Sequence, residues 1–111
     1  MRIWVTTRFE ALHKWPAAPD NVEFLKNSHR HIFHVKLLLN THHADRELEF
    51  ITVKRELEQE CISEIIEDME TDNQSMSCEM IGVKIKEWAE EKYNRGAEVH
   101  VSEDGENGAI V

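Results

Sequence analysis

The most informative part of the sequence is residues 28–40, which read SHRHIFHVKLLLN. It predicts a strand from about His29 to Asn40. Successive side chains of a strand point to opposite faces, so His29 and His31 emerge on the same side, about two residue rises apart. Arg30 then points away, and the two imidazoles are close enough to share one metal ion.

An earlier strand carries a third histidine. From Ile3 onward, apolar residues alternate with polar ones, which is the period of a half-buried strand. The inward positions are Ile3, Val5, Phe9 and Ala11. His13 is in phase with them, so it can supply a third nitrogen from a neighbouring strand. Residues 15–21 contain two prolines and an Asp-Asn pair, which predicts a loop after this strand.

Two helices are expected in the second half of the chain. Apolar residues recur at helical spacing in two groups, which are separated by the polar residues 71–75. The first group is Val53, Leu57, Cys61, Ile65 and Met69, and the second helix is marked by Ile81, Ile85, Trp88 and Lys92. Ser77 is suited to cap the second helix.

Short strands complete the expected topology. Residues 47–51 predict a returning strand after a polar turn, and residues 97–103 and 109–111 predict the last two strands. The inward face of the strand at 97–103 includes Glu103. This order predicts an α+β domain with two helices on one face of an antiparallel sheet.

Composition restricts the class of protein. The chain has 111 residues, which fits one domain spanning residues 1–111. Its formal net charge of −9 disfavours nucleic acid as a partner. No stretch reaches the roughly twenty apolar residues of a membrane span, and residues 1–7 do not read as a signal peptide. We therefore expect a soluble cytoplasmic protein without a membrane partner.

The histidines admit two interpretations. An isolated His-x-His pair is more often a pair of ordinary surface or core residues than a metal site. Three histidines from two strands, however, would leave an open coordination position, which is the pattern of a catalytic zinc. The order of other motifs along the chain favours the metal site. These are FEALH at 9–13, SHRH at 28–31, LEFITVK at 48–54, MSCE at 76–79 and VHVSE at 99–103.

This series resembles the tunnelling-fold family of pterin synthases, which includes 6-pyruvoyl tetrahydropterin synthase and 6-carboxytetrahydropterin synthase. The resemblance covers nearly the whole chain. It implies that His13, His29 and His31 bind Zn²⁺ and that Glu103 anchors a pterin or purine-like ring. A carboxylate suits that role because it accepts two parallel hydrogen bonds from an amino group and a ring N–H. As an alternative, Glu103 is only a solvated strand end.

The resemblance also implies contacts between the ligand and residues 77–78. Ser77 and Cys78 occupy the stretch where the family contacts its ligand, although helix capping is the simpler account of Ser77. No neighbouring residue in the sequence indicates an activated Cys78 thiol. Cys61 belongs to the apolar stripe of the first helix and is expected to be inert.

The chain departs from the family at its catalytic residues. The carboxy-forming branch has a cysteine where Leu25 stands, the usual glycine is replaced by Arg30, and no Asp-His segment follows the first helix. Glu23 lies six residues before His29, where the pyruvoyl-forming branch has its cysteine. A carboxylate there can act as general base or acid, which makes Glu23 the candidate catalytic residue. The alternative is that Glu23 is a plain loop charge.

Three functions remain open from the sequence. The first is a zinc-dependent lyase that acts on a reduced pterin, such as 7,8-dihydroneopterin triphosphate, in a pterin or deazaguanine pathway. The second is a binding protein that keeps the zinc and holds a pterin, purine or nucleotide without synthase activity. The third is a zinc-stabilised structural domain, whose metal would need no open position.

A homo-oligomer is expected because a small sheet with free edges and one uncovered face leaves surface for partners. The resemblance implies that such sheets close into a barrel between subunits, as a trimer or a hexamer built from trimers. The four other histidines are expected to lie outside the metal site. They are His34 and His100, which are out of phase, and His42 and His43, which lie in a turn.

Overall fold

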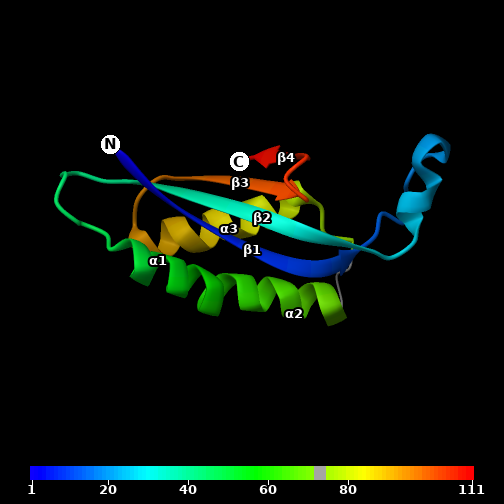
Figure 1. The fold of residues 1–111 in the computed structure, drawn as a ribbon, viewed down its shortest axis with the longest axis horizontal. Helices are drawn as coiled ribbons and strands as arrows, with labels where there is room; N and C mark the ends of the chain where they lie inside the picture. Colours follow the sequence, from blue (N-terminus) through cyan, green and yellow to red (C-terminus); the bar gives the residue numbers. More distant parts are fainter. Residues whose placement is uncertain (72–74) are drawn as a thin grey trace.

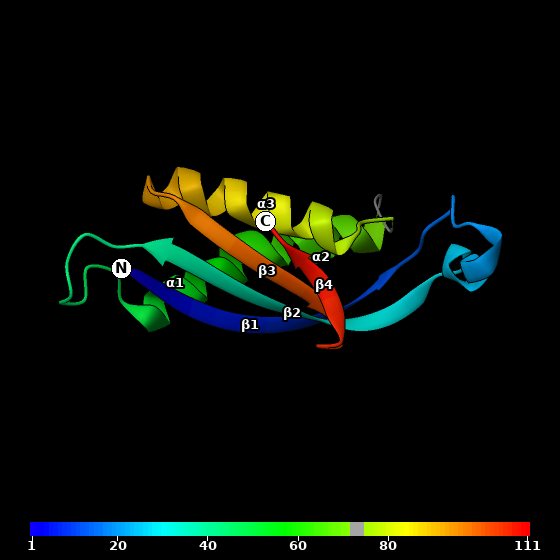
Figure 2. The ribbon, with the colours of Figure 1, turned by 90° about the horizontal axis from the view of Figure 1, so that it is seen from above.

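Four antiparallel strands form one sheet in the order β1-β2-β3-β4, and helices cover one of its faces (Figure 1). The computed structural model describes residues 1–71 and 75–111. The strands are β1 (Arg2–His13), β2 (His29–Asn40), β3 (Ala97–Glu103) and β4 (Asn107–Ile110). Figure 2 shows the helices together on one side of the sheet. The α+β class and the placement of helices on one face are therefore confirmed.

The strand register fixes which side chains meet on the covered face. β1 pairs with β2 so that His13 is opposite His29, and β2 pairs with β3 so that Phe33 is opposite Glu103. Odd-numbered residues of all three strands face the helices, as predicted from the alternation. The largest fully buried side chains come from this face, the helices and the segment before the last helix, and they include Phe33, Leu37, Leu39, Leu57, Met69, Met76, Ile81 and Ile85.

The first helical segment combines α1 (Phe50–Glu56), the π-helical turn η2 (Leu57–Ile62) and α2 (Ser63–Thr71). Its predicted stripe repeats strictly every four residues, so on a 3.6-residue helix it would rotate by about 40° at each step. The wider π turn reduces this rotation. All five residues of the stripe are buried as a result, and the segment packs against β1.

The second helix, α3 (Cys78–Tyr93), packs against β3 and β4. It begins as predicted, because the Ser77 side chain accepts a hydrogen bond from the backbone N–H of Met80 at 3.2 Å. It ends at Asn94, which adopts the left-handed conformation typical of a helix end. The expected polar break before α3 falls partly on residues 72–74, which lie outside the described residues.

The returning strand predicted at residues 47–51 is wrong. Both edges of β2 are already paired, one with β1 and one with β3, so a third strand has no free edge there. A helix begins in its place at Phe50, where the Glu49 carboxylate accepts hydrogen bonds from the N–H groups of Ile51 (2.9 Å) and Thr52 (2.8 Å). These bonds lower the pKa of Glu49.

The connection between β1 and β2 is an arm that projects from the body of the molecule (Figure 1). We expected only a loop at residues 15–21, but the chain also forms the short 3-10 helix η1 (Asp20–Lys26). The N–H of Trp15 donates to the carbonyl of Leu25 at 2.7 Å and closes the base of the arm. None of the side chains of η1 is buried.

The last strand begins two residues earlier than predicted, at Asn107, and it pairs with β3. Among the described residues, no helix is both long enough and apolar enough to cross a membrane.

Candidate metal centre

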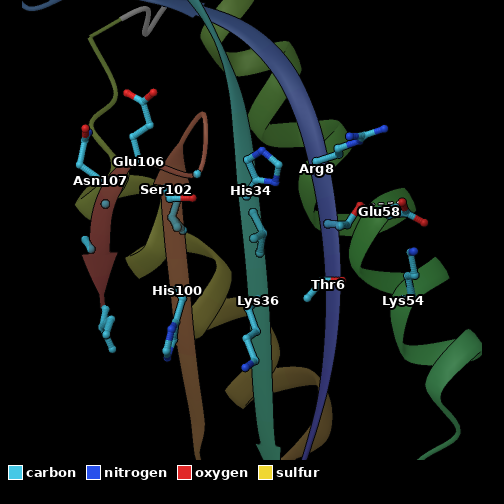
Figure 3. Close-up of a pocket in the computed structure, with 17 residues that line it drawn as sticks. Thr6, Arg8, His34, Lys36, Lys54, Glu58, His100, Ser102, Glu106 and Asn107 are labelled. Carbon is cyan, nitrogen blue, oxygen red and sulfur yellow. Dashed lines mark hydrogen bonds between the residues drawn. The ribbon is translucent and has the colours of Figure 1, made fainter.

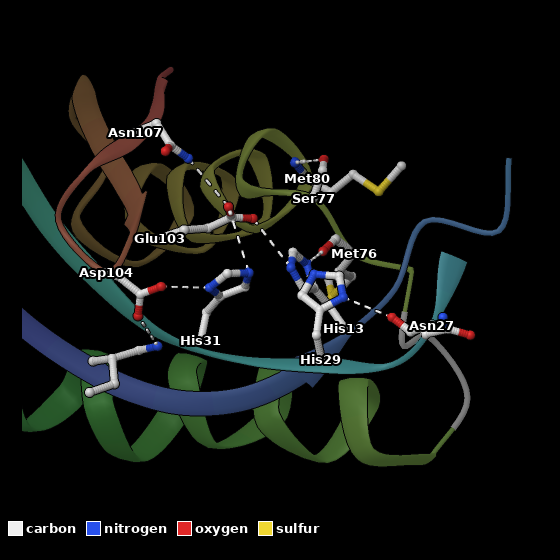
Figure 4. A network of polar contacts seen from close by, with 11 residues as sticks. His13, Asn27, His29, His31, Met76, Ser77, Met80, Glu103, Asp104 and Asn107 are labelled. Carbon is white, nitrogen blue, oxygen red and sulfur yellow. Dashed lines mark hydrogen bonds and ion pairs between the residues drawn. The ribbon is translucent and has the colours of Figure 1, made fainter. Parts of the chain in front are cut away.

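Three imidazoles meet at one end of the sheet, on the face covered by the helices (Figure 4). His13 is the last residue of β1, and His29 and His31 lie at the start of β2. One nitrogen from each ring lies within 4.8 Å of the other two. The alternation seen in the sequence predicted that they share a face, and the pairing of His13 with His29 brings them together. This group can hold a metal ion.

The other ring nitrogen of each histidine is held by an oxygen. Nδ1 of His13 lies 3.0 Å from the carbonyl of Met76, and Nδ1 of His29 lies 2.8 Å from the carbonyl of Asn27. A carbonyl oxygen only accepts hydrogen bonds, so each Nδ1 carries the proton. In the tautomer with the proton on Nδ1 the lone pair lies on Nε2, as a metal ligand requires.

His31 is oriented by a carboxylate. Its Nδ1 lies 2.6 Å from Oδ2 of Asp104, whose Oδ1 accepts the backbone N–H of Ile32 at 2.9 Å. The Ile32 N–H and the His31 ring together lower the pKa of Asp104, so it is a charged acceptor. Carboxylates and carbonyls that hold the remote nitrogen of a metal-binding histidine are a recurring feature of metal sites.

His13 gives the test of whether a metal fits. Its side chain is only 10% exposed, and its Nε2 is buried without a hydrogen-bond partner in the described part of the chain. Burial is the main cause that lowers the pKa of His13, so the ring is neutral at pH 7. A buried nitrogen with a free lone pair is costly unless something binds it. The donor set therefore fits a divalent ion that accepts nitrogen ligands.

Glu103 approaches the cluster from β3. Its Oε1 lies 3.3 Å from Nε2 of His13, and its Oε2 lies 3.8 Å from Nε2 of His31 (Figure 4). The amide of Asn107 donates to Oε2 at 3.3 Å. The predicted inward orientation of Glu103 is therefore confirmed, and the alternative of a solvated strand end does not apply.

Aromatic rings underlie the cluster. Phe33 stacks on Phe9 with 5.2 Å between ring centroids, and its ring meets that of His13 edge-on at 5.3 Å. Both phenylalanines belong to the hydrophobic core. The imidazoles thus lie at the boundary between a rigid core and solvent, which limits their rotation.

A cavity of about 450 Å³ opens beside the imidazoles. Its lining brings together most of the residues singled out in the sequence, namely His13, His29, Ser77, Cys78 and Glu103. The base of the arm adds Trp15 and Leu25. Ser77 acts as the cap of α3, which is the simpler of its two predicted roles, but it still borders the cavity.

The Cys78 thiol is not activated. Burial, followed by the charges of Glu103 and Glu79, raises its pKa to about 12. Burial likewise raises the pKa of Cys61 to about 12, and that side chain packs in the core as expected. Both thiols remain protonated at neutral pH and are poor nucleophiles.

Glu23 does not join the site. It lies in η1, its side chain is 70% exposed, and its nearest charged partner is Lys26 at 4.0 Å. It is not among the residues that line the cavity. Of the residues proposed from the sequence, Glu23 alone belongs neither to the imidazole cluster nor to the lining of the cavity.

A second cavity, of about 830 Å³, lies mainly over the open face of the sheet (Figure 3). His34 and His100 border it, so both point away from the imidazole cluster, as their phase predicted. His42 and His43 lie in the connection after β2. The imidazole cluster therefore contains three of the seven histidines.

The groups that orient the imidazoles are not predicted by the sequence pattern. These are the carbonyls of Met76 and Asn27 and the carboxylate of Asp104. A carbonyl leaves no signal in the sequence, since every residue has one. Asp104 did leave a signal, because it directly follows Glu103 at the start of a turn, but only the fold places it beside His31.

Neither a scan against protein-family models nor a search of the curated proteins finds a match for this chain. The proposed function therefore depends on the residues of the site itself.

Proposed function

We propose that this protein is a zinc-dependent lyase of the pterin-synthase type, which acts on a reduced pterin such as 7,8-dihydroneopterin triphosphate. The observation that carries the proposal is the convergence of three imidazole nitrogens and the Glu103 carboxylate beside one cavity. Three imidazoles are the ligand set of a catalytic zinc with an exchangeable fourth position. The reaction class comes from the resemblance of the sequence motifs to the family.

Each residue has a distinct role in this proposal. His13, His29 and His31 hold Zn²⁺, which when bound supplies a Lewis acid for an oxygen of the substrate side chain. Glu103 accepts hydrogen bonds from the amino group and ring N–H of the pterin. Asn107 restrains the carboxylate by donating to its Oε2.

The proposal includes a homo-oligomer with the tunnelling fold. β1 and β4 are the two edges of the sheet, and its open face carries exposed Trp4 and Ile32. Free edges and an uncovered face favour association with further copies of the chain. We expect a trimer or a hexamer, with the sheets closed into a barrel. A monomer in light scattering at micromolar concentration would contradict this part of the proposal.

The arm explains how Glu23 can act although it lies outside the cavity of its own subunit. Because η1 projects from the body of the subunit, an oligomer can place it beside the cavity of a neighbour (Figure 1). Glu23 would then transfer protons at a site whose zinc ligands belong to another subunit.

The first experiment is turnover of 7,8-dihydroneopterin triphosphate by the zinc-loaded protein, followed by chromatography of the products. A positioned general base contributes about a hundredfold to ten-thousandfold in rate, so Glu23→Gln should lower kcat by that factor with zinc content unchanged. Asp20→Asn removes a charge from the same arm and should keep the activity. Full activity of Glu23→Gln would exclude it as the base.

A complementation experiment tests the arrangement between subunits. Glu23→Gln and His29→Ala are each expected to be inactive alone. Oligomers that contain both variants should recover part of the activity, because some sites then combine an intact arm with an intact metal site. No recovery in mixed oligomers would contradict a shared site.

The second candidate function is a zinc-containing protein that binds a pterin, purine or nucleotide without synthase chemistry. It is favoured by the exposed position of Glu23 and by the high pKa of the Cys78 thiol, which leave the cavity without an evident proton-transfer residue. In that case calorimetry would detect binding that Glu103→Gln weakens, while no substrate is consumed.

A further inference from the structure

The buried Nε2 of His13 faces the Glu103 carboxylate without a hydrogen bond between them in the described part of the chain. The Nδ1 atoms of His13, His29 and His31 are each held by an oxygen, which leaves Nε2 as the ligand atom of each ring. The Glu103 carboxylate faces two of these nitrogens and is itself only an acceptor. Acceptors that face one another repel unless a cation lies between them.

The separation between Glu103 and His13 matches that between two ligands of one metal ion. Zinc–nitrogen and zinc–oxygen bonds of about 2.0–2.1 Å in a tetrahedron place neighbouring ligand atoms about 3.3–3.4 Å apart. Oε1 of Glu103 lies 3.3 Å from Nε2 of His13. Oε2 lies 3.8 Å from Nε2 of His31, so a small movement of the carboxylate completes the arrangement.

The fold holds Glu103 in this position. Its backbone pairs with Phe33, two residues beyond His31 on the neighbouring strand. Asn107 donates to its Oε2 from the paired strand β4. Figure 4 shows the carboxylate pointing toward the imidazoles.

We propose that Glu103 is the fourth protein ligand of the metal when no organic ligand is bound. This inference rests on the metal centre of the proposed function and deepens it. A carboxylate that ligates the metal cannot also hold the ring edge of a pterin, so Glu103 must leave the metal when the ring binds. Ring binding therefore opens the coordination position that the chemistry needs, and the metal stays closed to other molecules until then.

The test uses the full chain loaded with Co²⁺, whose visible absorption reports its coordination. Imidazole serves as a neutral probe of an open position, so repulsion by a charge cannot explain a weak response. The wild type should require at least tenfold more imidazole than Glu103→Gln for the same spectral change. Glu103→Ala, which has no side-chain oxygen, should behave like Glu103→Gln. Glu106→Gln removes the same charge from the adjacent turn and should behave like the wild type.

Zinc affinity provides the second measurement, by competition with a chromophoric chelator. Removing one of four ligands should weaken binding at least tenfold in both Glu103 variants, with no change in Glu106→Gln. Equal imidazole responses and equal affinities in the wild type and both Glu103 variants would overturn the inference while leaving the three-histidine site intact. Undiminished binding in a His29→Ala, His31→Ala double variant would instead overturn the metal centre itself, and the inference with it.

Discussion

Replacing Asp104 by asparagine tests how the second layer of the metal site works. Asp104 accepts two hydrogen bonds, from Nδ1 of His31 at 2.6 Å and from the N–H of Ile32 at 2.9 Å. Asparagine has the same shape but only one acceptor oxygen, so one of these two donors must face an NH₂ group. Either the His31 ring turns or its proton moves to Nε2, the nitrogen that the metal needs.

The expected result is weaker zinc binding without loss of the fold. Mutation of such an outer partner typically lowers metal affinity by about tenfold to a hundredfold. We expect this range for Asp104→Asn in competition with a chromophoric chelator, and an unchanged far-ultraviolet circular dichroism spectrum. The loss should be smaller than for His31→Ala, which removes the ligand itself.

The control is Glu106→Gln, because it removes one negative charge from the same turn without touching His31. If Asp104→Asn and Glu106→Gln weaken zinc binding equally, Asp104 acts only through its negative charge and not by orienting His31. If Asp104→Asn binds zinc as tightly as the wild type while His31→Ala does not, the orienting role is refuted.

Three further predictions concern the core, the thiols and pH. Leu57→Ala removes a fully buried side chain and should lower the free energy of unfolding by about 2–5 kcal/mol in urea titrations, whereas exposed Phe24→Ala should change it by less than about 0.5 kcal/mol. Burial raises the pKa of Cys61 and Cys78 to about 12. Neither thiol should therefore react rapidly with a disulfide reagent at pH 8 until the protein is unfolded. Rapid reaction of the native protein would contradict this burial. Burial also lowers the pKa of His13 below its ordinary 6.5. The unfolded chain therefore binds more protons at His13 than the folded chain does. The metal-free protein should lose stability as the pH falls below about 6.5. His13→Gln should show a smaller loss between pH 7.5 and pH 5 in chelator-treated samples, and an equal loss would refute this assignment.

Which residues share a face of the sheet follows from the sequence alone. Alternation in a strand is a local property, because each peptide unit reverses the direction of the side chain. It therefore placed His13, His29, His31 and Glu103 on the covered face, and it placed His34 and His100 on the open one. Helical spacing likewise identified both helices and the cap at Ser77.

Pairing between strands could not be predicted in the same way, because it depends on which edges remain free. Residues 47–51 have the composition of a short strand, but β1 and β3 already occupy both edges of β2. The Glu49 carboxylate can instead satisfy the N–H groups that begin a helix. The local pattern of residues 47–51 therefore did not determine their structure, because the available hydrogen-bonding partners favoured a helix start.

The groups that orient the imidazoles of the candidate metal site come together only in the folded chain. The Met76 carbonyl is 63 residues from His13 in sequence, and Asp104 is 73 residues from His31. The same folding left Glu23 on a projecting arm, away from the cavity that its spacing from His29 had suggested. Hydrogen bonds of this kind depend on distance and direction in space, and spacing along the chain determines neither once a loop or a helix intervenes.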